Sequence, residues 1–322
     1  MDAEGVHKVA VVGAGTMGPG LALVFARAGY AVSLYSRSDG TLDTARSVAA
    51  ADLETLVRHE LLEAADVPAT LARIAPTTSL VEVAAGAGLV VEAVAEDLDV
   101  KRAVFAELDA YCPDGAVFAS TTSYLDIFQV VPKRRLPTTV IAHWFAPPHI
   151  VPLVEVVRGE RTSDETVAVV VALLERLGKT PVIMDRFVPG FCVNRLLRSI
   201  GREVFFLLDN GYMTPEQLDA AVKASLVPRA LVLGFVQRYD FTGLDLSLAN
   251  LENPDYVEPA RDDAPRSLVD RVARGDLGVK SGRGFYDYSG RDLEDVLAAR
   301  DDALITAFAA AGELRREAVV RP

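Results

Sequence analysis

The amino-acid sequence predicts an α/β fold, in which a doubly wound and mainly parallel sheet is followed by an all-α C-terminal domain. Two observations support this prediction. Strand and helix patterns alternate as far as residue 184, and the patterns after Pro189-Gly190 are almost entirely helical. We therefore expect a sheet domain over residues 1–187 and a helical domain over residues 188–322.

The chain begins with a strand–helix–strand pattern that contains a glycine-rich turn. Lys8 to Val12 is a short β-type run, GAGTMG follows at residues 13–18, and an apolar helix pattern leads to a second β-type run from Ala31 to Tyr35. This order is typical of a Rossmann-type dinucleotide-binding unit, whereas a glycine motif without it would be weak evidence. The alternative is a simple tight turn.

Each residue of this turn has a physical role in the dinucleotide-binding interpretation. We expect Gly13 to permit the tight turn and Gly15 to let backbone amides approach a pyrophosphate. Gly18 would let the helix pack closely against the strand. The start of the helix, at Thr16 and Met17, would face the anion because free amides collect there.

The end of the second strand distinguishes between the two nicotinamide cofactors. NAD enzymes usually carry an Asp or Glu there, which accepts hydrogen bonds from the adenosine ribose. This chain has Ser36, Arg37 and Ser38, and a guanidinium between two hydroxyls is suited to a 2′-phosphate. We expect NADP(H) to be preferred, with NAD(H) as the other candidate. The alternative is an ordinary solvated loop.

Further strands are expected in four apolar runs, at Gly88 to Val94, Ala116 to Ser120, Thr139 to His143 and Pro181 to Met184. A helix is expected from Val167 to Leu177. Thr162 with Glu165 forms a capping-box signature before this helix, and Gly178 follows it as a stop signal.

The C-terminal half carries more apolar positions than one small helical domain requires. Apolar stripes at residues 231–233 and 296–310 predict a homodimer, and the alternative is that they fill the core of their own domain. Arg261 to Arg266 is expected to form a mobile, charged loop. A buried helix is expected from the apolar residues Leu196, Leu197, Val204, Phe205, Leu207 and Leu208.

His143 and Glu155 are the most informative pair in the sequence. Glu155 lies in the middle of a Val-rich strand pattern, Leu153 to Val157, where a carboxylate would lose much of its hydration energy unless a partner compensated it. An imidazole is a suitable partner, and the carboxylate would fix the tautomer of the ring. We therefore predict a general acid/base site. The alternative is a structural histidine beside a Glu at a strand edge.

Composition excludes several other classes of function. The 322 residues carry a formal net charge of −12 with acids and bases interspersed, so we expect no nucleic-acid or anionic-membrane partner. Two cysteines, Cys112 and Cys192, and four histidines without paired spacing predict no metal site. No apolar stretch approaches the ~20 residues of a membrane span, and the start MDAEGVHK lacks the apolar core of a signal peptide, so the default expectation is a cytoplasmic protein.

Six motifs together resemble the 3-hydroxyacyl-CoA dehydrogenase family and extend over nearly the whole chain. In order, they are GAGTMGPG, VVEAVAEDLDVKRAVF, FASTTSYL, HWFAPPHIVPLVEVV, VPGFCVNRLL and GVKSGRGFYDY. The stretch PPHIVPLVEVV and an expected extra helix near Asp292 to Ala311 resemble the branch that contains lambda-crystallin (L-gulonate 3-dehydrogenase) and carnitine dehydrogenase.

The resemblance implies roles for individual residues. The catalytic pair of the family matches the His–Glu pair described above. Ser123 matches a serine that contacts the reacting oxygen in the family, and Asn194 matches an asparagine beside the same oxygen. Glu96 and Lys101 match positions that approach the cofactor. Without the resemblance, a turn serine, a helix-capping asparagine and solvated charges would be the ordinary interpretations.

Three departures from the family pattern bear on the substrate. Ala146 replaces an asparagine, Tyr124 replaces a small serine, and the helical segment at residues 51–63 is acidic where the phosphates of CoA would favour lysines. CoA is therefore a disfavoured substrate. The aromatic side chains of Tyr124 and Trp144 would suit a ring-shaped ligand.

Together these observations predict an NAD(P)H-dependent oxidoreductase that interconverts a 3-keto group and a 3-hydroxy group by hydride transfer. A ketoreductase acting on a β-keto acid or a bulky, polyketide-like ketone is favoured. One alternative is a 3-hydroxyacyl-CoA dehydrogenase that acts on acyl-CoA thioesters. The other is a non-catalytic nucleotide-binding or structural protein.

Overall fold

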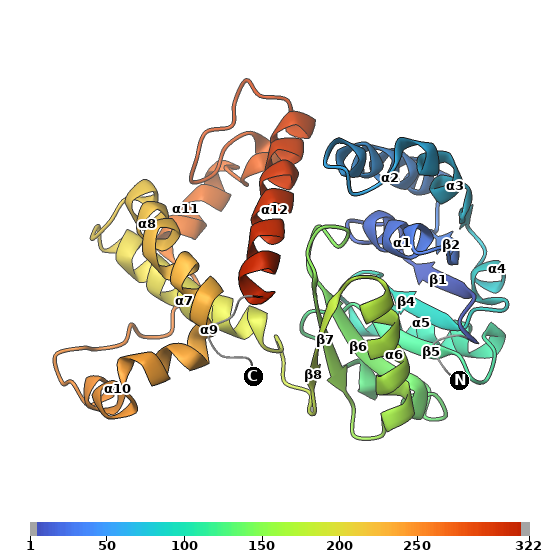
Figure 1. Ribbon diagram of the computed structural model, residues 1–322, viewed down its shortest axis with the longest axis horizontal. Coiled ribbons are helices and arrows are strands. Elements are labelled where there is room, and N and C mark those ends of the chain that lie inside the picture. Colours follow the sequence, from blue (N-terminus) through green and yellow to red (C-terminus); the bar gives the residue numbers. More distant parts are fainter. Residues whose placement is uncertain (1–4, 317–322) are drawn as a thin grey trace. The chain divides into compact units, whose positions relative to one another are not determined.

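The chain divides between Arg195 and Leu196 into two compact units (Figure 1). This computed structural model describes residues 5–316. The first unit contains a sheet with helices on both faces, and the second consists of helices and their connections. The predicted order, a doubly wound α/β domain followed by an all-α domain, is confirmed.

The strands of the first unit form one eight-stranded sheet in the order β3-β2-β1-β4-β5-β6-β7-β8. Strands β1 to β6 run parallel to one another, β7 runs antiparallel to β6, and β8 is parallel to β7. The strand order reverses at β1 and β4, and ligands of such sheets bind beyond the carboxyl ends of the strands at this point. The bounds are β1 Lys8–Val12, β2 Ala31–Tyr35, β3 Ile74–Thr77, β4 Leu89–Glu92, β5 Val117–Ser120, β6 Thr139–Trp144, β7 Leu153–Arg158 and β8 Thr180–Met184.

The sequence predicted every strand except β3. This strand has four residues, lies at the edge of the sheet and pairs only with β2. It contains Pro76, which cannot donate to a ladder and is therefore confined to edge strands and bulges. A short run with a proline and little apolar alternation gives no strand signal.

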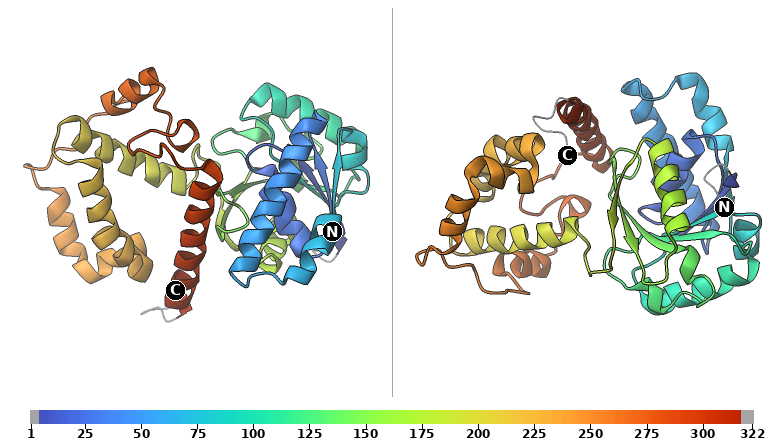
Figure 2. Two further views of the ribbon diagram at one scale, coloured as in Figure 1. Left: turned by 90° about the horizontal axis from the view of Figure 1, so that it is seen from above. Right: turned by 60° about the horizontal axis from the view of Figure 1, so that its bottom comes forward.

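Helices pack on both faces of the sheet (Figure 2). Helices α1, α2 and α6 bury side chains such as Leu21, Leu42 and Leu173 against one face. Helices α4 and α5 bury Val83 and Phe105 against the other face. The bounds are α1 Gly18–Arg27, α2 Asp39–Arg58, α3 Val67–Ala72, α4 Leu80–Ala84, α5 Leu98–Tyr111 and α6 Asp164–Arg176.

Helix α6 begins differently from the prediction and ends as predicted. Its N-cap is Ser163, whose hydroxyl accepts a hydrogen bond from the amide of Thr166. The expected capping box of Thr162 with Glu165 is wrong, because the Thr162 hydroxyl donates instead to the carbonyl of Thr139, at 2.6 Å. Gly178, with φ +70°, follows the last turn and ends the helix.

The second unit is helical, and the extra helix expected near its end is present as α12. Helix α9 is kinked at Gly234, which has φ 66° and ψ 178°. Residues 261–265 lie outside the helices, and Arg261 forms an ion pair with Asp263. The bounds are α7 Val193–Asp209, α8 Pro215–Ala221, a π-helical segment Val222–Leu226, α9 Val227–Thr242, α10 Leu244–Leu251, α11 Arg266–Arg274 and α12 Leu293–Arg316.

The prediction that α7 is a buried helix is wrong for the single chain. None of its residues is buried, and Leu196 and Leu197 are 45% and 56% exposed. The helical spacing of apolar residues predicts an apolar face, but it carries no information about what covers that face. Within residues 5–316, no helix is both long enough and apolar enough to cross a membrane.

Candidate active site

The register of two antiparallel strands brings His143 and Glu155 together. His143 of β6 and Glu155 of β7 are direct cross-strand partners. They alternate with Ile141 and Val157, so both side chains lie on the sheet face that α4 and α5 cover. The distance from Nδ1 of His143 to Oε2 of Glu155 is 2.7 Å. The side chains are 4% and 1% exposed, so the contact that the sequence implied is present and buried.

The other carboxylate oxygen of Glu155 is held by the backbone where α7 begins. Oε1 accepts hydrogen bonds from the amides of Cys192 at 3.0 Å and Val193 at 2.9 Å. Burial raises the pKa of Glu155, but the hydrogen bonds from His143 and these amides outweigh it and hold the pKa below its ordinary value. The ionised carboxylate can only accept, so Nδ1 of His143 must carry a proton. No sequence signal indicated these two amides.

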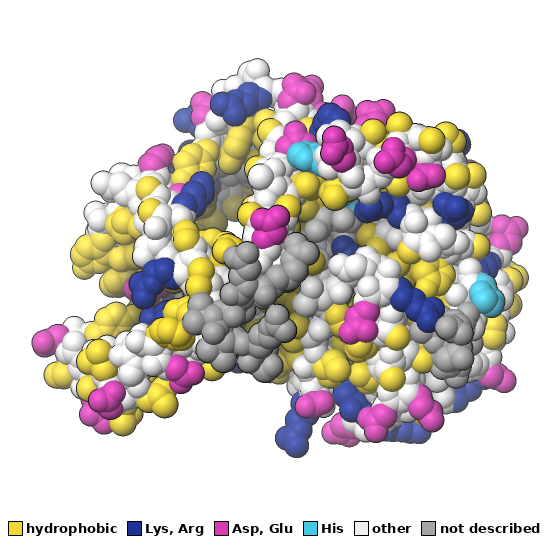
Figure 3. All heavy atoms as spheres, viewed as in Figure 1, with side chains coloured by type: hydrophobic (Ala, Val, Ile, Leu, Met, Phe, Trp, Pro, Cys, Tyr) yellow, Lys and Arg dark blue, Asp and Glu magenta, His cyan; other side chains and the backbone are white. Residues whose placement is uncertain are grey.

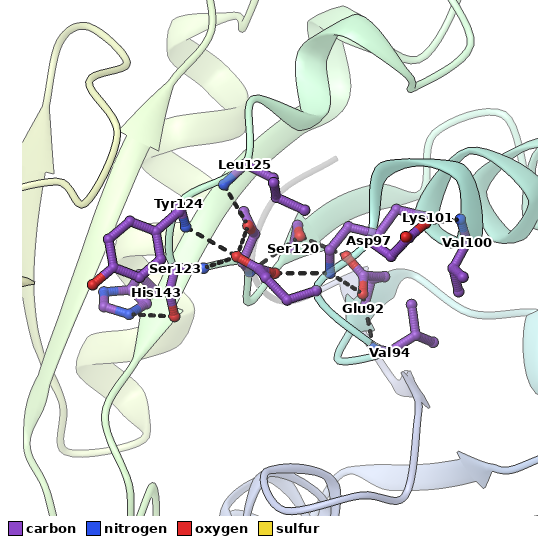
Figure 4. Close-up of polar contacts among 12 residues, drawn as sticks. Glu92, Val94, Asp97, Val100, Lys101, Ser120, Ser123, Tyr124, Leu125 and His143 are labelled. Atoms are coloured by element: carbon purple, nitrogen blue, oxygen red, sulfur yellow. Dashed lines mark hydrogen bonds and ion pairs between the residues drawn. The ribbon is translucent and has the colours of Figure 1, made fainter. Parts of the chain in front are cut away.

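The second ring nitrogen of His143 faces a loop that follows β5 (Figure 4). Oγ of Ser123 lies 3.2 Å from Nε2 of His143. We call residues 121–125 the Ser123 loop. Because a hydroxyl can both donate and accept, this contact accommodates either protonation state of Nε2.

Glu96 holds the Ser123 loop in place. Its Oε1 accepts hydrogen bonds from the Thr122 hydroxyl at 2.7 Å and from the amides of Ser123 at 2.9 Å and Tyr124 at 3.0 Å. Burial raises the pKa of Glu96, but these hydrogen bonds and the charge of Lys101 outweigh it, so the pKa lies below its ordinary value. The carboxylate is therefore an ionised acceptor for the loop that carries Ser123.

Sequence reasoning missed a second buried carboxylate, Glu92 at the end of β4. Glu92 is 0% and Lys101 of α5 is 1% exposed, and Nζ of Lys101 lies 2.7 Å from Oε1 of Glu92. The Ser120 hydroxyl donates to Oε2 at 2.5 Å, and the amide of Val94 donates to Oε1 at 2.8 Å. The sequence did contain a signal for Glu92. It ends an apolar strand, so its carboxylate, like that of Glu155, needs a partner when it is buried.

Aromatic rings lie against His143. The ring centroids of Phe145 and Phe191 are 4.6 and 5.2 Å from that of His143. The expectation that Trp144 faces the ligand is wrong, because successive residues of a strand face opposite sides of the sheet. Trp144 is 4% exposed and packs on the other face, against Phe25 of α1.

Asn194 directly follows the two residues whose amides hold Glu155. It is the second residue of α7 and is half-buried. Within the described chain its side chain makes no hydrogen bond to His143 or Ser123. The structure thus brings His143, Glu155 and Ser123 together and leaves Asn194 beside them.

The glycine-rich turn has two tight positions and one open position. Gly13 has φ +115°, and a Cβ there would lie 2.4 Å from the carbonyl oxygen of Ala93. A Cβ on Gly18 would lie 2.1 Å from the carbonyl oxygen of Gly13. No atom lies within 4 Å of the corresponding position on Gly15. The tight positions close the turn, and the open one lets a ligand approach the backbone.

A cavity of about 510 Å³ joins this turn to the start of α2. Gly15 and Thr16 line it from the turn, and Thr41 and Thr44 line it from α2. Helix α1 begins directly after Met17, so its free amides are directed toward this region. Amides at a helix N-terminus bind phosphate, and hydroxyls bind ribose. These groups therefore fit a dinucleotide.

Ser36, Arg37 and Ser38, which we expect to determine the cofactor preference, differ in their contacts. Ser38 lines the same cavity and caps α2, and its Oγ lies 2.9 Å from Oγ1 of Thr41. Ser36 is half-buried, and its amide donates to the carbonyl of Thr77. Arg37 is exposed, and in the described chain its guanidinium has no hydrogen bond or ion pair.

The polar groups around His143 are suited to proton transfer at one substrate oxygen. The ring presents Nε2 beside a hydroxyl, while its other nitrogen is fixed on a buried carboxylate. Such an arrangement can deliver or accept one proton without reorienting the ring. The carboxylate of Glu155 also compensates the positive charge of His143 when its ring is an imidazolium.

Comparisons with known proteins cover nearly the whole chain. Residues 8–187 match the family described as "3-hydroxyacyl-CoA dehydrogenase, NAD binding domain", and residues 190–288 match "3-hydroxyacyl-CoA dehydrogenase, C-terminal domain". The 5-formyl-3-hydroxy-2-methylpyridine 4-carboxylate 5-dehydrogenase of Mesorhizobium japonicum is 31% identical over 303 residues, 93% of this chain and 96% of that protein. The L-carnitine dehydrogenase of Streptomyces griseus is 33% identical over 323 residues, 98% of this chain and 93% of that protein.

One solved structure is similar over the same extent. It is a 5-formyl-3-hydroxy-2-methylpyridine 4-carboxylic acid 5-dehydrogenase, described as an NAD+-dependent dismutase. It superimposes with a TM-score of 0.84 at 29% identity, and the match covers 95% of this chain and 99% of that chain.

Proposed function

Since the chain belongs to the 3-hydroxyacyl-CoA dehydrogenase family, whose NAD-binding and C-terminal domains it contains, we propose that it interconverts a 3-keto and a 3-hydroxy group by hydride transfer. It is an enzyme, a dehydrogenase of this family. The observation that carries the proposal is the buried 2.7 Å contact between His143 and Glu155, with Ser123 on the other ring nitrogen at 3.2 Å.

The proposed mechanism follows from the charge that develops on the substrate oxygen. A bound nicotinamide cofactor supplies the hydride that reduces the ketone carbon. The ketone oxygen then gains negative charge, and His143 donates a proton to it from Nε2. Ser123 donates a hydrogen bond to the same oxygen, and Glu155 stabilises the imidazolium before the proton leaves. In the oxidation of the alcohol these roles reverse.

Asn194 completes the proposed catalytic set. Its half-buried side chain makes no hydrogen bond to His143 or Ser123 in the described part of the chain, so we assign its amide to the substrate oxygen. Glu96 and Lys101 have a different place in the proposal. They act on the cofactor side of the site, beyond the carboxyl ends of β4 and β5, where a doubly wound sheet binds its ligand.

We favour a β-keto acid or a bulky, ring-bearing ketone over an acyl-CoA thioester. Phe145 and Phe191 lie against His143, and Tyr124 on the Ser123 loop is 48% exposed. Because aromatic rings pack well against one another, these side chains suit a substrate that carries a ring. Three exposed acidic residues, Glu54 near the end of α2 and Glu60 and Glu63 in the segment after it, would repel the phosphates of CoA. The pyridine carboxylate and carnitine in the names of two relatives are likewise not thioesters.

The test compares substrates that carry the same reacting group. Free β-keto acids, cyclic ketones and acetoacetyl-CoA are offered with NADPH and with NADH, and oxidation of the cofactor is followed. The proposal predicts that the best ketone without CoA has a kcat/KM at least ~10-fold above that of acetoacetyl-CoA. If acetoacetyl-CoA is the best substrate of the panel, the acyl-CoA alternative replaces this proposal.

We also propose a preference for NADPH. No carboxylate lies among Ser36, Arg37 and Ser38, and the guanidinium of Arg37 has no partner in the described chain. An Arg37→Ala variant is expected to raise KM for NADPH by about 10-fold and to change KM for NADH by less than about 2-fold. A wild-type enzyme with the lower KM for NADH would contradict the preference but not the reaction.

We further propose that the enzyme is a homodimer that associates through its second unit. Hydrophobic side chains gather on the surface of these helices (Figure 3). On α9 the exposed residues Leu231, Val232, Phe235, Val236 and Tyr239 recur at helical spacing on either side of the kink. An exposed apolar stripe of this size is typical of an interface between proteins.

A further inference from the structure

A chain of polar contacts connects the buried end of β4 to the proposed catalytic histidine (Figure 4). Glu92 binds Lys101 at 2.7 Å, Lys101 lies 3.6 Å from Oε2 of Glu96, and Glu96 binds the Ser123 loop. Ser123 in turn contacts His143. Every member of this chain of contacts except Glu92 already has a place in the proposed function.

We propose that Glu92 is a positioning residue, which fixes the ammonium of Lys101 so that Glu96 holds Ser123 against Nε2 of His143. The proposal rests on the reaction proposed above, since it deepens the description of the same site. Glu92 does not contact the substrate or His143. It acts through Lys101, Glu96 and the Ser123 loop.

Glu92 is required because Lys101 and the Ser123 loop would otherwise both need Glu96 as their partner. Lys101 is 1% exposed, so its charge must be compensated inside the protein. Glu92 compensates this positive charge at hydrogen-bond distance, whereas Oε2 of Glu96 lies 3.6 Å from Nζ of Lys101. Oε1 of Glu96 is then free to accept the three hydrogen bonds of the Ser123 loop.

Removing the charge of Glu92 would change this division. Lys101 would have Glu96 as its remaining anion and would draw that carboxylate toward itself. Glu96 would turn away from the amides of Ser123 and Tyr124, and the Ser123 hydroxyl would lose its position beside His143. Glu92 itself is a rigid anchor, because the Ser120 hydroxyl donates to its Oε2 and the amide of Val94 donates to its Oε1, the oxygen that also binds Lys101.

The decisive experiment is a double-mutant cycle. Glu92→Gln keeps the shape of the side chain, removes its charge and replaces one acceptor oxygen by an amide group that donates. It is measured in the wild type and in a Ser123→Ala background. If Glu92 acts through Ser123, Glu92→Gln lowers kcat between ~10- and ~100-fold in the wild type and less than about 2-fold in Ser123→Ala, with little change in KM. Equal losses in both backgrounds, or no loss in the wild type, overturn the proposal.

Asp109→Asn is the matched control. Asp109 also binds a buried cation, Arg135, which is 2% exposed, but it lies at the other end of α5. The substitution is expected to lower the melting temperature without the background-dependent loss of kcat. If Glu92→Gln does not fold, Glu92→Asp carries the same cycle, because it keeps the buried negative charge but withdraws the carboxylate from Lys101 by one methylene group.

A second readout does not need turnover. The side-chain NMR signals of His143, assigned with a His143→Gln variant among the four histidines, report the contact with Ser123 directly. Glu92→Gln and Ser123→Ala are expected to shift the Nε2 signal alike, and the double variant is expected to shift it no further. Additive shifts overturn the positioning role. If the shifts coincide but no ketone is turned over, the proposed function fails and the positioning role stands.

Discussion

At the scale of single residues, burial of charge identifies the site. A carboxylate inside an apolar strand implied a partner for Glu155, and the register of β6 and β7 supplies His143. Glu92 likewise ends an apolar strand, so its burial beside a cation was predictable from the sequence but was not predicted. The amides of Cys192 and Val193 could not be found from the sequence, because they reach Glu155 from more than thirty positions away only after the chain folds.

Glu155 gives a prediction for stability against pH. Its pKa is held below its ordinary value, so the stability that it contributes is full above about pH 4.5 and is lost as the pH falls through the lower, folded-state pKa. Glu155→Gln is expected to reduce the free energy of unfolding by about 1–3 kcal/mol near pH 7. The difference from the wild type, measured by urea unfolding, should shrink below about pH 4.5. A difference that stays constant as the pH falls would show that the pKa of Glu155 is not depressed.

At the scale of elements, the sequence predicts helices and strands best where residues close together in the sequence determine the local structure. Alternating and periodic apolar patterns located the strands other than β3 and, among the helices that pack on the sheet, α1 and α6, and Gly178 ended α6 as expected. The N-cap of α6 was predicted one residue too early, at Thr162 instead of Ser163, because the Thr162 hydroxyl donates to the carbonyl of Thr139. Competing tertiary hydrogen bonds of this kind cannot be seen in a sequence.

The glycine-rich turn gives a prediction at this scale. In Gly18→Ala the new Cβ would lie 2.1 Å from the backbone of Gly13, so the turn must shift. We expect a loss of about 1–3 kcal/mol in the free energy of unfolding and at least a ~10-fold weaker Kd for the cofactor, measured by thermal unfolding and by fluorescence titration.

Gly40→Ala is the control for this variant. Gly40 lies in the first turn of α2, and no atom lies within 4 Å of the position that its Cβ would take. This variant should be as stable as the wild type or up to ~1 kcal/mol more stable, since alanine favours a helix. Equal effects of the two substitutions would mean that close packing at Gly18 does not shape the turn.

At the scale of the whole molecule, the sequence indicated two domains and an apolar surplus in the second. The helix that became α7 was predicted to be buried, yet its residues are not buried in the single chain. Periodicity shows which residues share a face of a helix, but the partner of that face depends on packing between distant segments. This is why the sequence predicted the architecture well and the burial of the second unit poorly.

The homodimer is a prediction at this scale. Light scattering should give twice the 34.6 kDa of one chain. Val236→Asp, at a position 83% exposed on α9, should lower the mass toward that of a monomer, because a buried unpaired charge opposes association. Val81→Asp, at a position 48% exposed on α4 of the first unit, should leave the mass unchanged. A monomeric wild type would contradict the proposed interface.

The central claim is that His143, oriented by Glu155, moves the proton while the hydride is transferred. The most direct measurement is the kcat of His143→Gln with the best ketone, together with Kd for the cofactor. The account predicts a kcat lower by about 10² to 10⁴ and a Kd within about 2-fold of the wild type, which also shows that the variant is folded. A variant that binds the cofactor normally and keeps kcat within a few-fold of the wild type would contradict it.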